Sequence, residues 1–168
     1  QFGLDPGRRT IGLLPGSRIH EVERLLPPLL ASAHLLQKEI PDLQFILPLA
    51  PGLPETILSS YIENISVPVK VVKGFNYDVM NLSDLLITAS GTATLEGAIL
   101  GKPMIIIYRV SFLSYWIGRA LIQVDHIGLV NLVAGKEIDT ELIQKDNNHQ
   151  RIEEKDIQNL RNKILSRK

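Results

Sequence analysis

Short aliphatic runs alternate with amphipathic segments along the first 110 residues of the chain. Each run is rich in leucine, isoleucine, valine or threonine and ends near glycine, proline or polar residues, which is typical of strands buried on both faces of a parallel sheet. The predicted strands are residues 10–14, 43–47, 69–72, 84–88 and 104–108. The pattern therefore predicts a parallel sheet that is covered on both sides.

Segments with apolar residues at helical spacing follow these strands. The spacing predicts helices over residues 18–39, 54–63, 93–100, 111–123, 139–144 and 152–166. Proline lacks the backbone N–H and clashes with the preceding turn, so Pro27 and Pro28 predict either a kink in the first helix or its division into two pieces. Alternating strands and helices indicate an α/β fold, a doubly wound parallel sheet of Rossmann-like type.

In such a sheet, ligands bind beyond the carboxyl ends of the strands, near the point where the strand order reverses. The loops after the predicted strands are therefore the first places to look for a site. They cover residues 15–18, 50–53, 73–76, 89–92 and 109–111.

The length of 168 residues suggests one folded domain. We expect residues 1–9 to be a linker remnant and residues 10–144 to form the α/β domain, which would bind a ligand through the loops named above. Residues 145–168 are polar and mixed in charge, and we expect them to form a C-terminal helix.

Composition narrows the classes of partner and cofactor. Eighteen Lys and Arg residues balance eighteen Asp and Glu residues, so no excess of positive charge favours nucleic acid as a partner. Cysteine is absent and the four histidines lack the spacing of metal ligands, so we expect neither a bound metal nor a cofactor. No apolar run in the sequence reaches the ~18 residues of a membrane-spanning helix.

The segment at residues 89–96 carries the strongest local signal. Ser90, Gly91 and Thr92 join a strand to a helix, and their small side chains let a phosphate approach the backbone N–H groups at the positive end of that helix. Glu96 lies one turn into the helix, within reach of a pair of sugar hydroxyls. Ordinary N-capping by Thr92 also explains the loop. The residues alone leave sugar-nucleotide binding and plain capping both open.

The loop at residues 15–18 is the second candidate. Gly16 permits a tight turn, Ser17 can cap the following helix, and Arg18 can hold a phosphate through two hydrogen bonds. The alternative is a capped helix with a solvated arginine. Neither loop matches the dinucleotide or P-loop motifs, so no NAD or ATP site is predicted.

Two further features carry weaker hypotheses. Asp125 and His126 form an adjacent acid and base, although neighbouring side chains often point apart. Residues 104–130 mix aliphatic, aromatic and basic side chains, which fits either a membrane-surface patch or a strand followed by a core-packed helix.

Three spaced motifs together resemble one enzyme family. They are Leu13-Leu14-Pro15-Gly16-Ser17-Arg18, Ala89-Ser90-Gly91-Thr92-Ala93-Thr94-Leu95-Glu96 and Ile127-Gly128-Leu129-Val130-Asn131-Leu132-Val133-Ala134-Gly135-Lys136-Glu137. In this order they resemble the carboxyl-terminal half of the lipid-A-disaccharide synthases, over residues 10–144. The resemblance implies a GT-B glycosyltransferase with two facing doubly wound domains, of which this chain holds the nucleotide-binding one.

The resemblance implies transfer of 2,3-diacylglucosamine from UDP-2,3-diacylglucosamine to 2,3-diacylglucosamine 1-phosphate, with release of UDP. The catalytic base is expected on an amino-terminal domain that this chain lacks, so the catalytic residues are unknown and the chain alone is expected to be inactive. The implied location is the cytoplasm of a Gram-negative bacterium. Peripheral contact with the inner membrane is a further expectation, because the substrates carry acyl chains.

The resemblance also assigns residues to the parts of the donor. The diphosphate lies near two loops, the ribose near a carboxylate, and the uracil near the loop after the third strand. The residues are Gly16, Ser17, Arg18, Ser90, Gly91 and Thr92 for the diphosphate, Glu96 for the ribose hydroxyls, Lys73, Gly74 and Phe75 for the uracil, and Asn131 for the cleft between the domains.

Two alternatives remain. Another GT-B-like UDP-sugar enzyme, such as a UDP-N-acetylglucosamine 2-epimerase or a peptidoglycan precursor transferase, shares the strand–Ser/Gly–helix–Glu pattern, although no acid/base set of an epimerase is found. A non-catalytic nucleotide-binding module is the other, and a one-sided cluster of Lys or Arg would favour it. The charges in this sequence are evenly mixed.

Overall fold

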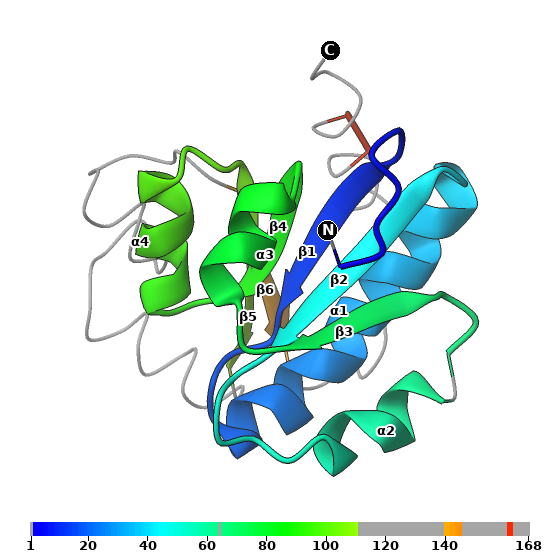
Figure 1. The fold of residues 1–168 in the computed structure, drawn as a ribbon. Helices are drawn as coiled ribbons and strands as arrows, with labels where there is room; N and C mark the ends of the chain where they lie inside the picture. The colour runs from blue at the N-terminus through cyan, green and yellow to red at the C-terminus, as the bar shows by residue number, and fades with distance from the viewer. Residues whose placement is uncertain (1, 64, 111–139, 146–160, 163–168) are drawn as a thin grey trace.

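The computed structural model describes residues 2–63, 65–110, 140–145 and 161–162. Its six strands form one sheet in which all neighbours run parallel, in the order β3-β2-β1-β4-β5-β6 (Figure 1). The strands are β1 Arg9–Leu14, β2 Leu43–Leu49, β3 Val69–Lys73, β4 Leu85–Ala89, β5 Met104–Val110 and β6 Thr140–Lys145. The chain builds outward from β1 in one direction and then returns to add β4 on its other side. The strand order therefore reverses between β1 and β4.

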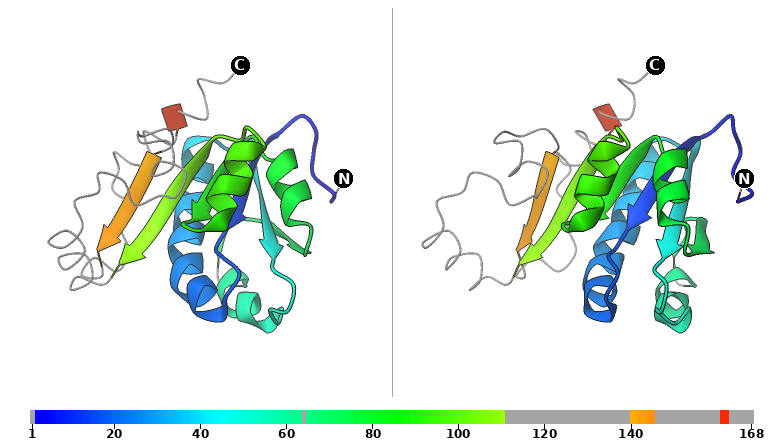
Figure 2. Two further views of the ribbon diagram at one scale, coloured as in Figure 1. Left: turned by 90° about the vertical axis from the view of Figure 1, so that its left-hand side faces the viewer. Right: turned by 60° about the vertical axis from the view of Figure 1, so that its left-hand side comes forward.

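Helices cover both faces of this sheet. They are α1 Ile19–Glu39, α2 Thr56–Ile62, α3 Asn76–Leu82 and α4 Thr92–Ile99. Helices α1 and α2 lie on one face, whereas α3 and α4 lie side by side on the other (Figures 1 and 2). This arrangement confirms the predicted α/β fold with a doubly wound parallel sheet.

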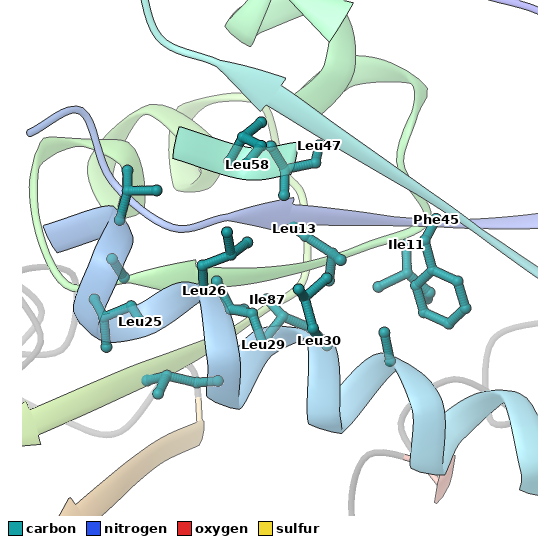
Figure 3. Packing of buried hydrophobic residues seen from close by; sticks show 14 of the residues in the cluster. Ile11, Leu13, Leu25, Leu26, Leu29, Leu30, Phe45, Leu47, Leu58 and Ile87 are labelled. Atoms are coloured by element: carbon teal, nitrogen blue, oxygen red, sulfur yellow. The ribbon is translucent and has the colours of Figure 1, made fainter. Parts of the chain in front are cut away.

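Alternate residues along the strands point to opposite faces of the sheet and form two separate hydrophobic cores. On the face covered by α1, Leu13 and Ile87 are buried in one cluster with Leu26 and Leu29, and Phe45 lies in the same cluster beside Ile11 (Figure 3). The core on the other face is smaller, and it is formed by Leu14, Met80, Leu86, Met104 and Ile106. Removal of this apolar surface from water is the main force that holds the helices to the sheet.

Helix α1 is continuous through Pro27 and Pro28, so the predicted division into two pieces is wrong. Buried leucines lie on both sides of the prolines, which anchors each half of the helix to the same sheet face. The buried residues of α1 are Val22, Leu25, Leu26, Leu29, Leu30, Ser32, Ala33 and Leu36. Tertiary packing outweighs the loss of the two backbone donors, since most of the stability of a protein helix comes from its packed face.

The helix predicted over residues 139–144 is also wrong, because Thr140–Lys145 forms β6. This strand pairs in parallel along β5, from Ile105↔Thr140 to Val110↔Lys145. The sheet edge at β5 offers a row of backbone hydrogen-bonding groups, and pairing with it decides the conformation of a segment too short to show a clear period. The boundary predicted at residue 144 thus falls inside a strand.

Helix α3 is an element that the sequence pattern did not predict. It has seven residues, of which only Val79 and Met80 are buried, so it shows too little of a helical period to be recognised. All five predicted strands and the helices predicted at 18–39, 54–63 and 93–100 are confirmed. The helix predicted over residues 111–123, and nearly all of residues 146–168, lie outside the described residues.

Candidate functional site

Two loops from distant parts of the sequence meet at the point where the strand order reverses. Strands β1 and β4 are neighbours, and Leu14 pairs with Thr88 near their carboxyl ends. The loop that carries Gly16 to Arg18 therefore lies beside the loop that carries Ser90 to Thr92. This is the location at which doubly wound sheets bind their ligands.

The loop after β4 leads into α4 without a side-chain cap among the described residues. Gly91 is the N-cap residue and Thr92 is the first residue of the helix, so the capping by Thr92 that the sequence allowed does not occur. A Cβ atom built on Gly91 would find no atom within 4 Å. Ser90 and Thr92 are exposed on either side of this opening. The start of α4 can therefore accept an anion against its backbone N–H groups.

Thr94 stabilises the turn at Gly91 through two hydrogen bonds to the same carbonyl oxygen. Its hydroxyl is buried and donates a hydrogen bond to the carbonyl oxygen of Gly91 at 2.7 Å. The backbone N–H of Thr94 donates to the same oxygen at 3.1 Å. These two bonds fix the turn, and neither adds negative charge to it.

The loop after β1 is closed by a side chain of its own helix. Glu21 Oε2 accepts hydrogen bonds from the backbone N–H groups of Ser17 at 3.1 Å and Arg18 at 3.3 Å. Glu21 also covers Gly16, since a Cβ atom built there would lie 2.6 Å from Glu21 Oε2. Arg18 rather than Ser17 is the N-cap residue, so the predicted capping by Ser17 is wrong. The carboxylate of Glu21 takes the place that an external anion would occupy.

Arg18 is paired with the same carboxylate. Its Nη1 donates to Glu21 Oε1 at 2.7 Å, and the arginine side chain is otherwise 81% exposed. Partial burial alone would raise the pKa of Glu21. The hydrogen bonds from the Arg18 side chain and from the backbone of Ser17 and Arg18, with the positive charge of Arg18, outweigh this and hold the pKa of Glu21 below its usual value.

The loop after β3 has an unusual backbone. Gly74 and Phe75 both lie in the left-handed region, at φ 72° and 58°, and left-handed geometry is uncommon for a bulky residue such as phenylalanine. The N–H of Gly74 donates to Leu49 O at 2.8 Å, which ties the loop to the end of β2. The Phe75 ring is 60% exposed and contacts Phe2 at 5.5 Å between ring centroids. The conformation thus presents an aromatic ring beyond the carboxyl ends of the strands.

The sequence predictions placed Lys73 in this loop too. Its ammonium lies 3.5 Å from Glu55 Oε1, and both side chains are exposed. The loop that carries Lys73, Gly74 and Phe75 follows the carboxyl end of its strand, as the other two loops do. It is not adjacent to them, because β2 separates β3 from β1.

Helix α3, which follows this loop, contacts α4 through a side-chain hydrogen bond. Tyr77, in the first turn of α3, donates its phenolic O–H to Glu96 Oε1 at 3.1 Å. The hydrogen bond to the carboxylate, together with its negative charge, raises the pKa of Tyr77. Sequence reasoning found Glu96 but missed Tyr77, because α3 was not predicted. An aromatic residue just after the glycine–phenylalanine turn is the signal that was available.

Comparison with known proteins shows the family of this chain. Residues 1–168, the whole chain, match the family described as Lipid-A-disaccharide synthetase. The chain belongs to the lipid-A-disaccharide synthetase family. This confirms the resemblance carried by the three sequence motifs.

Two relatives within the lipid-A-disaccharide synthetase family show how much of the protein the chain represents. It is 46% identical to the lipid-A-disaccharide synthase of Nitrosococcus oceani over 163 residues, which cover 97% of this chain and 42% of that protein. It is 50% identical to the enzyme of Geobacter sulfurreducens over 151 residues, which cover 90% of this chain and 39% of that protein. The chain thus spans about two fifths of the length of these synthases.

A solved structure supports the fold assignment. The E. coli ADP-heptose LPS heptosyltransferase II superposes with a TM-score of 0.64 at 13% identity, covering 98% of this chain and 49% of that one. The fold of this synthetase-family chain is therefore that of one half of a GT-B glycosyltransferase.

Several predicted features lie outside the described residues, among them Asn131 and the pair Asp125 and His126. Among the residues that the structure describes, no group of three His, Cys, Asp or Glu side chains gathers to hold a metal ion. In the same part of the chain, no helix is long and apolar enough to cross a membrane.

Proposed function

We propose that this chain is the donor-binding half of a lipid-A-disaccharide synthase. The full enzyme would transfer 2,3-diacylglucosamine from UDP-2,3-diacylglucosamine to 2,3-diacylglucosamine 1-phosphate and release UDP. The observation that carries the proposal is the uncapped start of α4 at the reversal of strand order, with Glu96 one turn further on. Membership of the synthetase family over the whole chain supports it.

The diphosphate of UDP would bind against the start of α4. The backbone N–H groups of Thr92 and Ala93 supply donors at the positive end of the helix, and the exposed hydroxyls of Ser90 and Thr92 add two more. The open space beside Gly91 lets a phosphate oxygen approach the backbone closely. This cradle would stabilise the negative charge that develops on UDP as it departs.

The loop after β1 would contribute through the Arg18 side chain rather than through its backbone. The N–H groups of Ser17 and Arg18 are already occupied by Glu21, whereas the Arg18 guanidinium has further donors beyond the one that Glu21 accepts. Gly16 and Ser17 would shape the wall beside the diphosphate.

The nucleoside would lie toward α3. Glu96 would accept hydrogen bonds from the two ribose hydroxyls, and Lys73, Gly74 and Phe75 would line the uracil pocket. The left-handed turn at Gly74 and Phe75 fits this role, because strained backbone conformations gather at ligand sites. Asn131 would face the cleft between the two domains.

The reaction would be an inverting displacement. A base on the acceptor-binding domain would take the proton of the acceptor hydroxyl, whose oxygen bonds to the anomeric carbon while the bond from that carbon to UDP breaks. Holding donor and acceptor together is worth roughly 7–11 kcal/mol of barrier reduction. We therefore expect this chain to bind UDP without forming disaccharide, and product formation by the pure chain would contradict this.

The acylated substrates also suggest where the enzyme works. We expect a cytoplasmic protein that contacts the inner membrane surface through the aromatic and basic residues within 104–130. Flotation of the full-length protein with liposomes should fall in Trp116→Asp, and equal flotation of the two proteins would remove this part of the proposal.

Calorimetric titration with UDP, uridine and ADP tests the donor-binding role. We expect UDP to bind more tightly than uridine, which lacks the diphosphate, and ADP not to bind. Glu96→Ala should lose most of the UDP affinity because the ribose contact is removed. Equal affinity for UDP and ADP, or unchanged binding in Glu96→Ala, would contradict the proposed function.

A further inference from the structure

The side chain of Tyr77 donates a hydrogen bond to the Glu96 carboxylate, and the function proposed above gives Tyr77 no role. We propose that Tyr77 is a positioning residue that holds the Glu96 carboxylate in the orientation needed to bind the nucleotide ribose. The inference rests on the proposed function, which assigns the ribose to Glu96.

The Glu96 carboxylate would have two hydrogen-bond partners, the phenol of Tyr77 and the ribose. The phenolic O–H of Tyr77 donates to Oε1 at 3.1 Å, across the space between the first turn of α3 and the second turn of α4. The two helices lie side by side on one face of the sheet (Figures 1 and 2). With Oε1 oriented by the phenol, Oε2 and the remaining lone pair of Oε1 are left to accept from the two ribose hydroxyls.

The backbone under Glu96 is already fixed, so the side chain is what remains to be ordered. The neighbouring Gly97 packs tightly on the sheet, since a Cβ atom built there would lie 2.8 Å from Met104 Cε and 3.0 Å from Leu86 Cδ1. Glutamate has several rotatable bonds and loses their freedom when it binds a ligand. A hydrogen bond that orders the carboxylate beforehand reduces this loss.

Core packing does not explain the tyrosine. Tyr77 is 59% exposed, and the buried residues of α3 are Val79 and Met80 instead. Tyr77 follows Phe75 by two residues and reaches Glu96, so the phenol lies between the loop expected to hold the base and the carboxylate expected to hold the ribose. Its hydroxyl is therefore placed to act on nucleoside binding through Glu96.

The test compares UDP with 2′,3′-dideoxy-UDP, which lacks both ribose hydroxyls, in calorimetric titrations of the full-length protein. Tyr77→Phe removes only the hydroxyl. We expect it to weaken UDP binding by about three- to tenfold, from the range of side-chain ordering terms, and to leave binding of 2′,3′-dideoxy-UDP unchanged. Equal weakening for both ligands would mean a merely structural tie between α3 and α4 and would overturn the inference. Unchanged UDP binding would overturn it as well.

Two further variants separate this inference from the proposed function. Tyr61→Phe, on α2 at the opposite face of the sheet, removes a phenol hydroxyl away from Glu96 and should bind both ligands as the wild type does. In Glu96→Gln, unchanged affinity for UDP would refute the ribose role itself. Weakened affinity in Glu96→Gln, with none in Tyr77→Phe, would refute only the positioning role of Tyr77.

Discussion

The two strand–helix junctions at the reversal of strand order share a topology and differ in one side chain. At the β1–α1 junction, the third residue of the helix is Glu21, whose carboxylate reaches back to the N–H groups of Ser17 and Arg18. At the β4–α4 junction, the third residue is Thr94, whose hydroxyl turns toward the Gly91 carbonyl. The first helix start is thus filled by its own chain, and the second is left open.

Under the proposed function, the difference explains why only one of the two junctions would bind an anion. Both junctions have a glycine and the positive end of a helix, which are the general requirements for phosphate binding. Glu21 neutralises the first helix end and contributes to stability there, whereas Thr94 stabilises its turn without adding charge. The residue at the third helical position therefore decides whether the helix start is filled by its own chain, as at Glu21, or left open for the proposed ligand, as at Thr94.

The largest expected effect comes from filling the open junction. In Gly91→Asp, the new carboxylate would cap α4 and repel the diphosphate, so we expect UDP affinity in calorimetric titration to fall about tenfold or more. Thermal stability should rise or stay the same, because the space beside Gly91 is empty. Gly91→Asn, which caps without a charge, is the matched control and should lose less affinity. Equal loss in the two variants would show that charge at this position is not what matters.

Removing the Glu21 carboxylate from the β1–α1 junction should have a smaller effect, and it should raise rather than lower UDP affinity. Glu21→Ala removes the acceptor for two backbone N–H groups and for Arg18, so the free energy of unfolding in denaturant should fall by about 1 kcal/mol. Because a negative charge is lost and Arg18 is released, UDP affinity should rise by about two- to threefold. Weaker UDP binding in a folded Glu21→Ala protein would contradict the comparison.

The smallest effect is the pH dependence of this cap. The pKa of Glu21 in the folded chain is below its unfolded value of 4.5. Its stabilising contribution is therefore complete above that value and is lost as the pH falls through the lower, folded pKa. Denaturant unfolding of the wild type and Glu21→Gln between pH 3 and pH 7 should show a stability difference at neutral pH that shrinks in acid. A difference that stays constant with pH would mean that the charge of Glu21 does not contribute.

The parts of the fold that the sequence predicted correctly are segments whose hydrophobic pattern matches their burial in the structure. The aliphatic runs that became β1, β2, β4 and β5 have buried residues on both faces, and both candidate site loops were located from the ends of β1 and β4. Strand β6 was mistaken for a helix, because its conformation depends on pairing with β5. Helix α3 was missed because it buries only two residues, and Tyr77 was missed with it.

The site was predicted less completely than the fold, for a local reason. Each N-cap lies one residue away from the expected one, at Arg18 rather than Ser17 for α1 and at Gly91 rather than Thr92 for α4. That shift decides which side chain occupies the third helical position and thus which junction is filled. The charge of Glu21 suits a helix start, but its contact with the backbone depends on the exact course of the turn at Gly16.

The central claim is that the diphosphate binds at the open start of α4, and amide NMR titration of the ¹⁵N-labelled protein tests it most directly. Addition of UDP should shift the backbone N–H signals of Gly91 and Thr92 strongly and those of Ser17 and Arg18 less, and uridine should leave all four nearly unchanged. Strong UDP-dependent shifts at Ser17 and Arg18, with Gly91 and Thr92 unmoved, would contradict the account.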